Sequence, residues 1–549
     1  MKLDEHKIHL YLIVAIILVH FMGLFVDVMD IDASQYASIA QEMVQDGQWL
    51  QLYHRQMPYL DKPPLLFWLS AFSFKIFGVS NFAYKFPSFL FALLTIFSTY
   101  KLTKYYYGNR AGLIAAIIIG SVQGLYSITL DVRTDSILIG SVTFAIWQLS
   151  QYIEKQNYKN LFLGSIGIAL AMLAKGPIGI MVPFLAIGGD VLMNRQWKVI
   201  FKWQWIIGLG TIALILSPMT YGLYTQFDSH PEIFVNGKTG VSGVYFYFWE
   251  QSFGRLTGEN VWSNNAGPFF FIHTLLWAFL PWTLILIPAL VDRLRNYRKK
   301  SKYSEYISIF GFLLPFIAFS ISKYKLPHYI FVVFPLAAML LAAYIDKIKK
   351  TNFILKYGQF AILGLLWIIA FVLLFYVFTP VSLFVASVSI ALLGLVIWII
   401  IRLKNFKAVV FATAITAIGI NLILNGHTYP SLLTYQSTSI VGKWLKDHPK
   451  EKIHFTCFKK HMHAIDFQGG KTFSFKSSIS ELTFNDKYLY TDDIGLLELE
   501  NGNISYKIIQ AYEDFAVTRL NIKFLNPKSR KENIRNRYLI EINHSKMAQ

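Results

Sequence analysis

Hydrophobic stretches alternate with short polar connections along the chain as far as about residue 424. Most of these stretches are close to the ~17–25 residues that an α-helix needs to cross a bilayer. By that length criterion we expect about thirteen membrane-spanning helices. The stretches cover residues 8–26, 86–103, 111–130, 136–153, 160–174, 177–193, 203–224, 268–290, 305–321, 327–346, 353–378, 380–401 and 408–424.

Lysine and arginine residues gather in every second connection between these stretches. Membrane proteins keep such clusters on the cytoplasmic side. We therefore expect a cytoplasmic N-terminus, and an odd number of helices places the C-terminus outside. Loops 27–85 and 225–267 and the tail after Asn425 then lie on the outer face. The basic connections are residues 2–7, 101–110, 155–159, 195–202, 293–302, 347–350 and 402–407.

Composition supports an integral membrane protein. The chain is 54% hydrophobic and 16% aromatic, with a mean hydropathy of +0.43, and a soluble protein of this kind would expose too much apolar surface. The net charge of +19 lies mostly in the inner connections, so we expect no nucleic-acid partner. The single Cys457 rules out an intramolecular disulfide. The first stretch lacks a small-residue cleavage site, so we interpret it as a retained helix.

The first outer loop contains unusual charged positions. Asp30 and Asp32 follow the first helix, and an amphipathic helix over residues 34–45 is expected to lie along the membrane surface. Further on, Asp61 and Lys62 precede a double proline, which holds the charge on a stiff backbone. Taken alone, the two aspartates are more often a solvated loop start, and an exposed Asp-Lys pair contributes little to stability.

Other short outer turns carry charges that a bilayer surface does not require. Basic residues there oppose the positive-inside trend, and an anionic ligand such as a lipid phosphate explains them. A carboxylate can take a proton from an acceptor group while cations stabilise a phosphate leaving group. The pattern therefore indicates group transfer from a lipid-linked phosphate. The residues of these turns are Asp131, Arg133, Asp135, Lys175, Lys323, Lys325, His328 and Tyr329.

Several motifs resemble one known family, the lipid A aminoarabinose transferases, bacterial relatives of the dolichyl-phosphate-mannose protein mannosyltransferases with a GT-C fold. The resemblance covers most of the chain and is most specific in the first outer loop. It implies a mainly α, polytopic GT-C bundle with a small C-terminal α/β domain. The matching segments are residues 32–43, 47–49, 58–65, 77–79, 173–177, 250–255, 267–271, 320–327, 429–430 and 435–437.

The resemblance also implies roles for individual residues. Asp32 corresponds to the catalytic carboxylate that activates the acceptor, and Asp135 is a second acidic position near it. The expected ligands of the donor phosphate are Lys62, Lys175, Arg255, Lys323 and Lys325, and the expected supporting residues are Asp30, Tyr36, Arg133, Glu250 and Tyr329.

A divalent metal is the only cofactor that the resemblance suggests. Asp61 replaces a family glutamate at a metal site, and Asn264 or Asn265 stands where the family has histidine. Zinc prefers His, Cys and carboxylate ligands, so an aspartate with only amides nearby is a poor site.

The tail differs in pattern from the rest of the chain. Short alternating segments near residues 453–455, 473–475, 488–490, 504–506 and 538–542 predict strands, and residues 441–445 begin a helix. A domain of ~110 residues can bury its own core. We therefore expect a transmembrane domain over 1–425 and a periplasmic α/β domain over 426–549, without a nucleophile triad, phosphate loop or Cys-His metal spacing.

The sequence thus favours an inverting glycosyltransferase of the bacterial inner membrane. Its donor is a polyprenyl-phosphate sugar, and its acceptor is lipid A or another envelope glycan on the periplasmic face. Two alternatives stay open: a protein O-glycosyltransferase, and a transporter of lipid-linked sugars without transfer chemistry. Transporters place charges near mid-membrane and show internal repeats, whereas here the charged motifs cluster at the outer helix ends.

Overall fold

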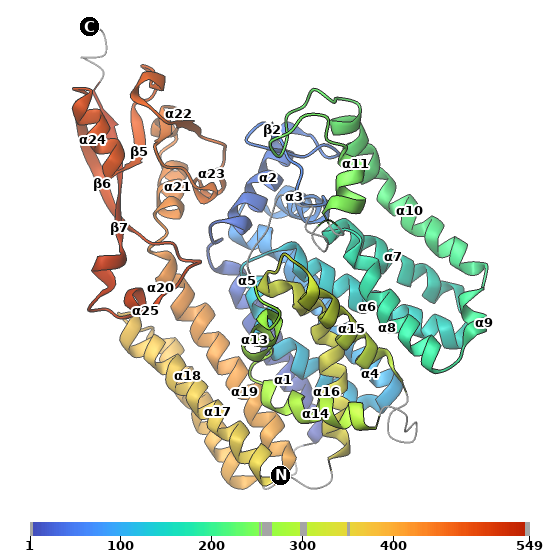
Figure 1. The fold of residues 1–549 in the computed structure, drawn as a ribbon. Coiled ribbons are helices and arrows are strands. Elements are labelled where there is room, and N and C mark those ends of the chain that lie inside the picture. The colour runs from blue at the N-terminus through green and yellow to red at the C-terminus, as the bar shows by residue number, and fades with distance from the viewer. Residues whose placement is uncertain are drawn as a thin grey trace.

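The computed structural model describes residues 4–251, 254, 266–296, 305–348, 352–403 and 405–543. A large helical bundle fills most of the molecule, and a smaller domain with a β-sheet is attached at one side, beside α2 (Asp32–Asp46) (Figure 1). The mainly helical bundle with a small C-terminal sheet domain confirms the expected fold class.

The bundle contains helices of very different lengths. In order, they are α1 (Glu5–Met22), α2 (Asp32–Asp46), α3 (Leu65–Phe77), α4 (Asn81–Ser121), α5 (Gln123–Leu130), α6 (Thr134–Lys155), α7 (Tyr158–Lys175), α8 (Ile178–Met193), α9 (Trp197–Ile200), α10 (Gln204–Leu223), α11 (Gly243–Tyr245), α13 (Phe270–Ala278), α14 (Thr283–Arg295), α15 (Ile307–Ile321), α16 (Phe334–Lys347), α17 (Phe353–Val372), α18 (Leu383–Arg402), α19 (Phe406–Ile423) and α20 (Tyr429–Leu433).

Eight helices of the described part are long and apolar enough to span a membrane, or nine if a bent pair counts as one span. The count of about thirteen stays a prediction. The expected single helix over 268–290 is instead α13 and α14, which meet at 119°. Pro281 lies in this break and lacks the N–H that a continuous helix would need. The predicted stretch 86–103 and the first part of 111–130 form α4, whose helical geometry is interrupted at Gly108 with φ of 87°. The rest of 111–130 forms α5.

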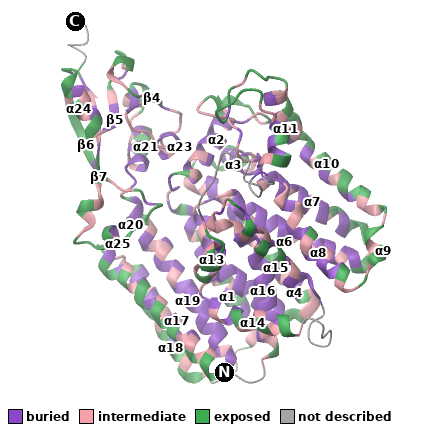
Figure 2. Ribbon diagram, viewed as in Figure 1, coloured by how far each residue is buried: buried purple, intermediate pink, exposed green. Residues whose placement is uncertain are grey.

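Burial separates the helices into an inner and an outer set. Most of the apolar stretch of α6, α16 and α19 is buried, whereas 28% of that of α10, α17 and α18 is buried (Figure 2). The outer helices carry exposed side chains such as Ile206, Ile368 and Leu383. Such apolar surface requires a lipid environment, so the chain is a multi-pass membrane protein.

The tail forms the predicted α/β domain. Its helices are α21 (Ser437–Asp447), α22 (Pro449–Ile453), α23 (His463–Gly469), α24 (Asp493–Asn501) and α25 (Ile522–Leu525), and its strands are β3 (Phe455–Phe458), β4 (Ser474–Lys476), β5 (Tyr488–Asp492), β6 (Tyr506–Asp514) and β7 (Arg535–Ile542). The sheet has the order β4-β3-β5-β7-β6, with β3 parallel to both neighbours and the remaining pairs antiparallel.

Alternating side chains of the sheet pack on opposite faces, as the period of a strand requires. Tyr490 and Leu539 pack with α21 and α23, whereas Leu489 and Ile540 pack with α24. The helical chain continues from α19 to Leu433 before these elements begin, and the boundary between 425 and 426 stays a prediction.

Helix α2 differs from its expected surface position. Its residues from Ala33 to Met43 are buried except for Gln35, which is partly exposed, because its apolar side packs on α3 and its polar side faces α23. Ser38 Oγ donates to the carbonyl oxygen of His463 at 3.2 Å, and Gln45 Nε2 donates to that of Gly470 at 2.8 Å. The polar face that suggested a solvated helix therefore binds the tail domain.

Candidate active site

A cavity of about 150 Å³ lies where loop 27–85 meets the ends of α6 and α7 and the 3₁₀ helix η4 (Pro327–Val333). Eight of the predicted site residues line it together, although they come from distant parts of the sequence. The lining residues are Asp32, Gln35, Tyr36, Asp61, Lys62, Arg133, Thr134, Asp135, Lys175, Tyr324, Leu326, His328 and Tyr329.

Asp32 is the most open carboxylate among the ion pairs of the cavity. It is the first residue of α2, where the helix dipole favours a negative charge, and its side chain is 41% exposed. The guanidinium of Arg133 forms an ion pair with it and also contacts Asp131 Oδ2 at 3.0 Å. Burial raises the pKa of Asp131, and Arg133 opposes that rise. Arg133 thus holds two carboxylates, one of which faces the cavity.

Asp135 is almost completely enclosed. It lies in the first turn of α6, its side chain is 3% exposed, and Lys175 Nζ approaches its Oδ1 at 2.5 Å. His328 Nε2 lies 3.7 Å from the other carboxylate oxygen. Lys175 ends α7, where Gly176 adopts a φ of 83°, and its ammonium lies 4.3 Å from the ring centroid of Tyr329. Lys175 is therefore held between a carboxylate and an aromatic face.

Lys62 and Asp61 form a more accessible pair. Both Asp61 oxygens accept from Lys62 Nζ, at 3.0 and 2.9 Å, and the side chains are 17% and 30% exposed. A second, mostly apolar cavity adjoins this pair. Its lining includes Leu50, Leu52, Tyr59, Leu60, Pro63, Pro64, Met219, Leu223, Phe246 and Tyr247.

Tyr36 supplies a hydroxyl to the cavity. The residue is 4% exposed, and burial raises its pKa well above the usual range. The group therefore stays protonated and can donate a hydrogen bond at neutral pH.

Four other predicted residues are not brought into the cavity lining. Lys325 is buried and donates to the carbonyl oxygen of Ala266 at 2.9 Å, Lys323 is exposed, and Glu250 ends the π-helix η3 (Phe246–Glu250). Arg255 lies outside the described residues. The phosphate-binding and supporting roles of these residues stay predictions.

Asp30, the fifth, lies at the junction with the tail domain. It is buried and accepts from Ser34 Oγ at 2.5 Å, Thr438 Oγ1 at 2.8 Å and the Ala464 backbone N–H at 2.9 Å. Burial raises its pKa against these hydrogen bonds. Two of the three donors belong to the tail, so Asp30 fixes the start of α2 to that domain.

Four of the lining residues are not among the predicted site residues: Gln35, Thr134, Tyr324 and Leu326. Gln35 precedes Tyr36 within the motif of residues 32–43, and Tyr324 lies between Lys323 and Lys325. Membership of these motifs was the only sign in the sequence that they could belong to the site. For His328 the sequence left anion contact and interfacial placement open, and the structure places it beside Asp135.

A metal at Asp61, which the sequence already makes a poor site, does not fit the observed donors. Both carboxylate oxygens contact the Lys62 ammonium, and within the described residues Asp61 belongs to no group of three His, Cys, Asp or Glu ligand atoms. Asn264 and Asn265 lie outside those residues. A cation that already occupies both oxygens competes with a metal ion, so we derive no chemical step through a metal here.

The fold places the chain in a structural class: it is a polytopic membrane protein with the GT-C glycosyltransferase fold. Its structure matches that of ArnT from Cupriavidus metallidurans bound to undecaprenyl phosphate, with a TM-score of 0.73 over 100% of both chains at 17% identity. The apo form of that protein matches with a TM-score of 0.72 over 98% of both chains, also at 17% identity.

Sequence comparison is consistent with that fold. Residues 61–221 match the family described as dolichyl-phosphate-mannose-protein mannosyltransferase. An undecaprenyl phosphate-α-4-amino-4-deoxy-L-arabinose arabinosyl transferase 2 of Proteus mirabilis is 26% identical over 58% of this chain and 56% of its own length. The corresponding transferase of Wigglesworthia glossinidia brevipalpis is 24% identical over 64% of this chain and 61% of its own length.

The chain therefore spans less than two thirds of the length of these two relatives. The chain is thus similar to these transferases in sequence over part of its length and to ArnT in fold.

Proposed function

We propose that the chain is an inverting glycosyltransferase that moves a sugar from a polyprenyl-phosphate donor to lipid A or another envelope glycan. The main support is the single cavity that brings Asp32 together with Lys62 and Arg133. The names of the relatives specify aminoarabinose on undecaprenyl phosphate, so a pentose on a polyprenyl phosphate is the donor that we expect.

Asp32 is the proposed general base. Its exposure allows an acceptor hydroxyl or phosphate to reach the carboxylate, which takes the acceptor proton. The acceptor oxygen then attacks the anomeric carbon from the face opposite the leaving group. The bond from that carbon to the phosphate oxygen breaks, the configuration inverts, and the polyprenyl phosphate leaves with the bonding electrons.

Lys62 is the proposed partner of the leaving phosphate. Its ammonium can stabilise the charge that develops on the phosphate oxygen, and its pairing with a partly exposed Asp61 leaves it accessible. The mostly apolar cavity beside it measures about 20 Å³, so it is too small to hold an isoprene unit in this structure. Asp135 is enclosed, so its proposed contribution is to hold Lys175 rather than to meet the acceptor.

The proposed location is a bacterial inner membrane. The N-terminus would be cytoplasmic, and the first outer loop and the tail domain, residues 426–549, would be periplasmic. This orientation follows from the basic clusters of the inner connections. This orientation places the cavity on the periplasmic side. Nucleotide sugars stay in the cytoplasm, so a polyprenyl phosphate is the form of donor that can be used there.

Mass spectrometry of lipid A and surface glycans tests the proposal. Cells carrying the wild-type gene should add a sugar of defined mass to one envelope glycan, and cells carrying Asp32→Asn should not. An unchanged glycan profile in the presence of the wild-type gene would refute envelope transfer.

Protein O-glycosylation is the second candidate, because residues 61–221 match a protein mannosyltransferase family. New mass on a Ser- or Thr-containing peptide, with lipid A unchanged, would favour it. Movement of the lipid-linked sugar across proteoliposomes without any new glycosidic bond would instead favour the transporter.

A further inference from the structure

A second cavity lies between the tail domain and the start of α2, and we call it the tail cavity. Its volume of about 560 Å³ is within the range of small-molecule sites. Ile31 lines the tail cavity, whereas the next residue, Asp32, lines the cavity described above. Because consecutive Cα atoms lie about 3.8 Å apart, the two cavities adjoin at these two residues.

Positive charge exceeds negative charge in the lining of the tail cavity. The cavity that holds Asp32 is balanced, with three carboxylates and three cations besides His328. The tail cavity has two carboxylates and four cations, so it attracts a ligand with negative charge. Its carboxylates are Asp30 and Asp514, and its cations are Lys460, Arg519, Arg535 and Arg537.

Both carboxylates already have partners within the protein. Asp30 accepts the three hydrogen bonds described above. Asp514 Oδ1 accepts from the backbone N–H of Ser437 at 3.2 Å and from its hydroxyl at 2.5 Å. Arg537 Nε lies 3.4 Å from Asp514 Oδ2, and its NH1 group lies 3.0 Å from Asp492. These groups therefore compensate one another and leave the other three cations of the lining without a counter-charge.

Lys460, Arg519 and Arg535 form no ion pair within the part of the chain that the structure describes. They come from three segments of the tail: the connection before α23, the connection after β6, and the start of β7. Both arginines are exposed, and Lys460 is partly buried. A guanidinium group can donate two parallel hydrogen bonds to a phosphate. Three cations also match the charge of a phosphate group, which is about −1.5 to −2 at neutral pH.

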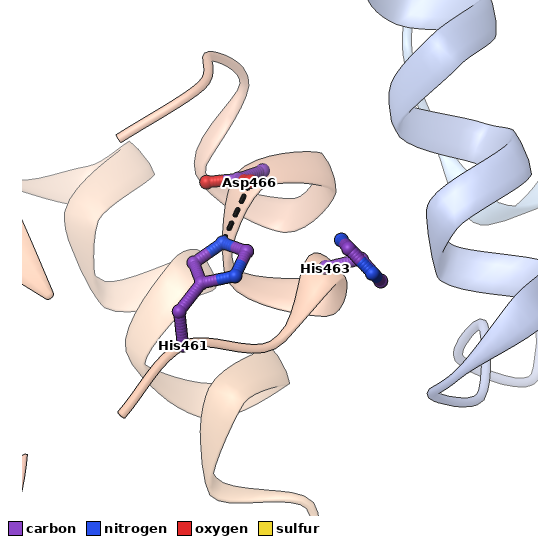
Figure 3. Close-up of side chains that lie close together, drawn as sticks. All are labelled: His461, His463 and Asp466. Carbon is purple, nitrogen blue, oxygen red and sulfur yellow. Dashed lines mark hydrogen bonds and ion pairs between the residues drawn. The ribbon is translucent and has the colours of Figure 1, made fainter. Parts of the chain in front are cut away.

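The position of Lys460 is fixed through its neighbour, His461. His461 Nε2 lies 2.8 Å from Asp466 Oδ2 (Figure 3), and the Arg55 guanidinium pairs with the same buried carboxylate. Arg55 belongs to loop 27–85, which also carries Asp32. This network therefore holds one wall of the tail cavity against the loop of the proposed base.

Another part of the wall is apolar. Phe515 stacks on Phe524 with the ring centroids 3.8 Å apart, and Val517 is buried in the same cluster. Ile31 is 42% exposed and lines the cavity with Phe515 and Val517. An apolar surface beside unpaired cations suits a sugar ring that carries an anionic group.

We propose that the tail cavity binds a phosphate group of the acceptor glycan and thereby places the acceptor beside Asp32. Arg519 and Arg535 are the phosphate ligands, and Lys460 adds a third positive charge. This docking role rests on the transfer proposed above, because it concerns the acceptor of that reaction. No bond is made or broken in the tail cavity, so its cations act on acceptor binding rather than on the chemical step.

Acceptor binding by the full-length protein in detergent, without donor, tests the proposal. The probes are lipid A that carries its phosphates and the same lipid A after their enzymatic removal. The wild type should bind the phosphorylated form at least about 100-fold more tightly. Arg519→Gln/Arg535→Gln should weaken binding of that form by about 100-fold, or about tenfold for each charged hydrogen bond. Binding of the dephosphorylated form should not change.

Two further double variants serve as controls. Lys446→Gln/Lys507→Gln removes the same charge from exposed tail residues outside the cavity lining, so it should bind like the wild type. Arg519→Lys/Arg535→Lys restores the charge and should recover part of the binding. The unfolding temperature should stay unchanged in each variant, because the replaced side chains are exposed.

Binding and transfer are measured separately so that the docking role and the transfer can fail separately. Equal binding of both lipid A forms by the wild type, or wild-type binding of the phosphorylated form by Arg519→Gln/Arg535→Gln, would overturn the docking role even where sugar is transferred. In the transfer assay, that variant should raise the acceptor KM more than it lowers kcat. Preferential binding of phosphorylated lipid A by a wild type that transfers no sugar would support the phosphate site and refute the proposed transfer.

Discussion

Replacing Asp32 by Asn should lower the rate of sugar transfer without lowering the thermal stability of the protein. The side chains of Asp32 and Arg133 are 41% and 24% exposed, and ion pairs of this exposure contribute about 0–1 kcal/mol. Arg133 also keeps Asp131 as a partner. The fold should therefore survive with little loss of thermal stability. General-base assistance contributes about 10²–10⁴-fold in rate, or about 3–5 kcal/mol of barrier, so transfer should fall by that factor.

Asp135→Asn is the informative comparison. Asp135 is 3% exposed and pairs with Lys175, which is 11% exposed. Removing one partner of a buried pair costs about 3–5 kcal/mol, because the other charge stays buried without compensation. This variant should lose stability and transfer together, whereas Asp32→Asn should lose transfer alone.

The assay follows a labelled sugar from polyprenyl phosphate to an envelope acceptor in proteoliposomes. Thermal unfolding in detergent is measured on the same preparations, and donor binding is measured separately. Asp32→Asn should bind donor like the wild type. Transfer by Asp32→Asn at the wild-type rate would refute its assignment as the base, and a stability loss as large as that of Asp135→Asn would refute the analysis of the two ion pairs.

Three further outcomes are expected. Lys62→Ala should raise the donor KM strongly and leave the unfolding temperature unchanged, because its ion pair with Asp61 is partly exposed. Lys507→Ala, on the exposed tail surface, is the control. Wild-type kinetics in Lys62→Ala would show that the motif around Lys62 has only a structural role. Lys175→Met should lower the unfolding temperature, and adding Asp135→Asn should recover part of the loss because no buried charge remains; no recovery would contradict the pairing. A reporter fused after residue 549 should be periplasmic, and a cytoplasmic reporter would remove the outer-face site.

Periodicity and length were sufficient to predict several elements. The stretch 353–378 corresponds to a span of Phe353–Val377, and the tail strands near 488–490 and 538–542 lie within β5 and β7. The stretch 268–290 satisfied the same length criterion but is bent at 119°. Hydropathy averages over a window, so it cannot detect a local break inside an apolar run.

Tertiary contacts explain what the sequence could not predict about the site. The polar face of α2 has the composition of a solvated face, and only the docked tail shows that Ser38 and Gln45 have backbone partners. The resemblance implied roles for Asp32 and Lys62 in one reaction, but their ion-pair partners depend on which helix ends meet. The ion pair of Arg55 with Asp466 likewise depends on how the first loop meets the tail.

The pairing of charges in the cavity determines which cation can receive a phosphate. The lining contains three carboxylates and three cations besides His328, so a phosphate adds a negative charge to a balanced set. Withdrawing Lys175 from Asp135 would leave a buried carboxylate without compensation, at a cost of several kcal/mol. Withdrawing Lys62 from Asp61 leaves a carboxylate that is 30% exposed and can be hydrated. The donor phosphate should therefore replace Asp61 as the partner of Lys62. Lys175 should stay paired with Asp135 and supply a fixed positive charge.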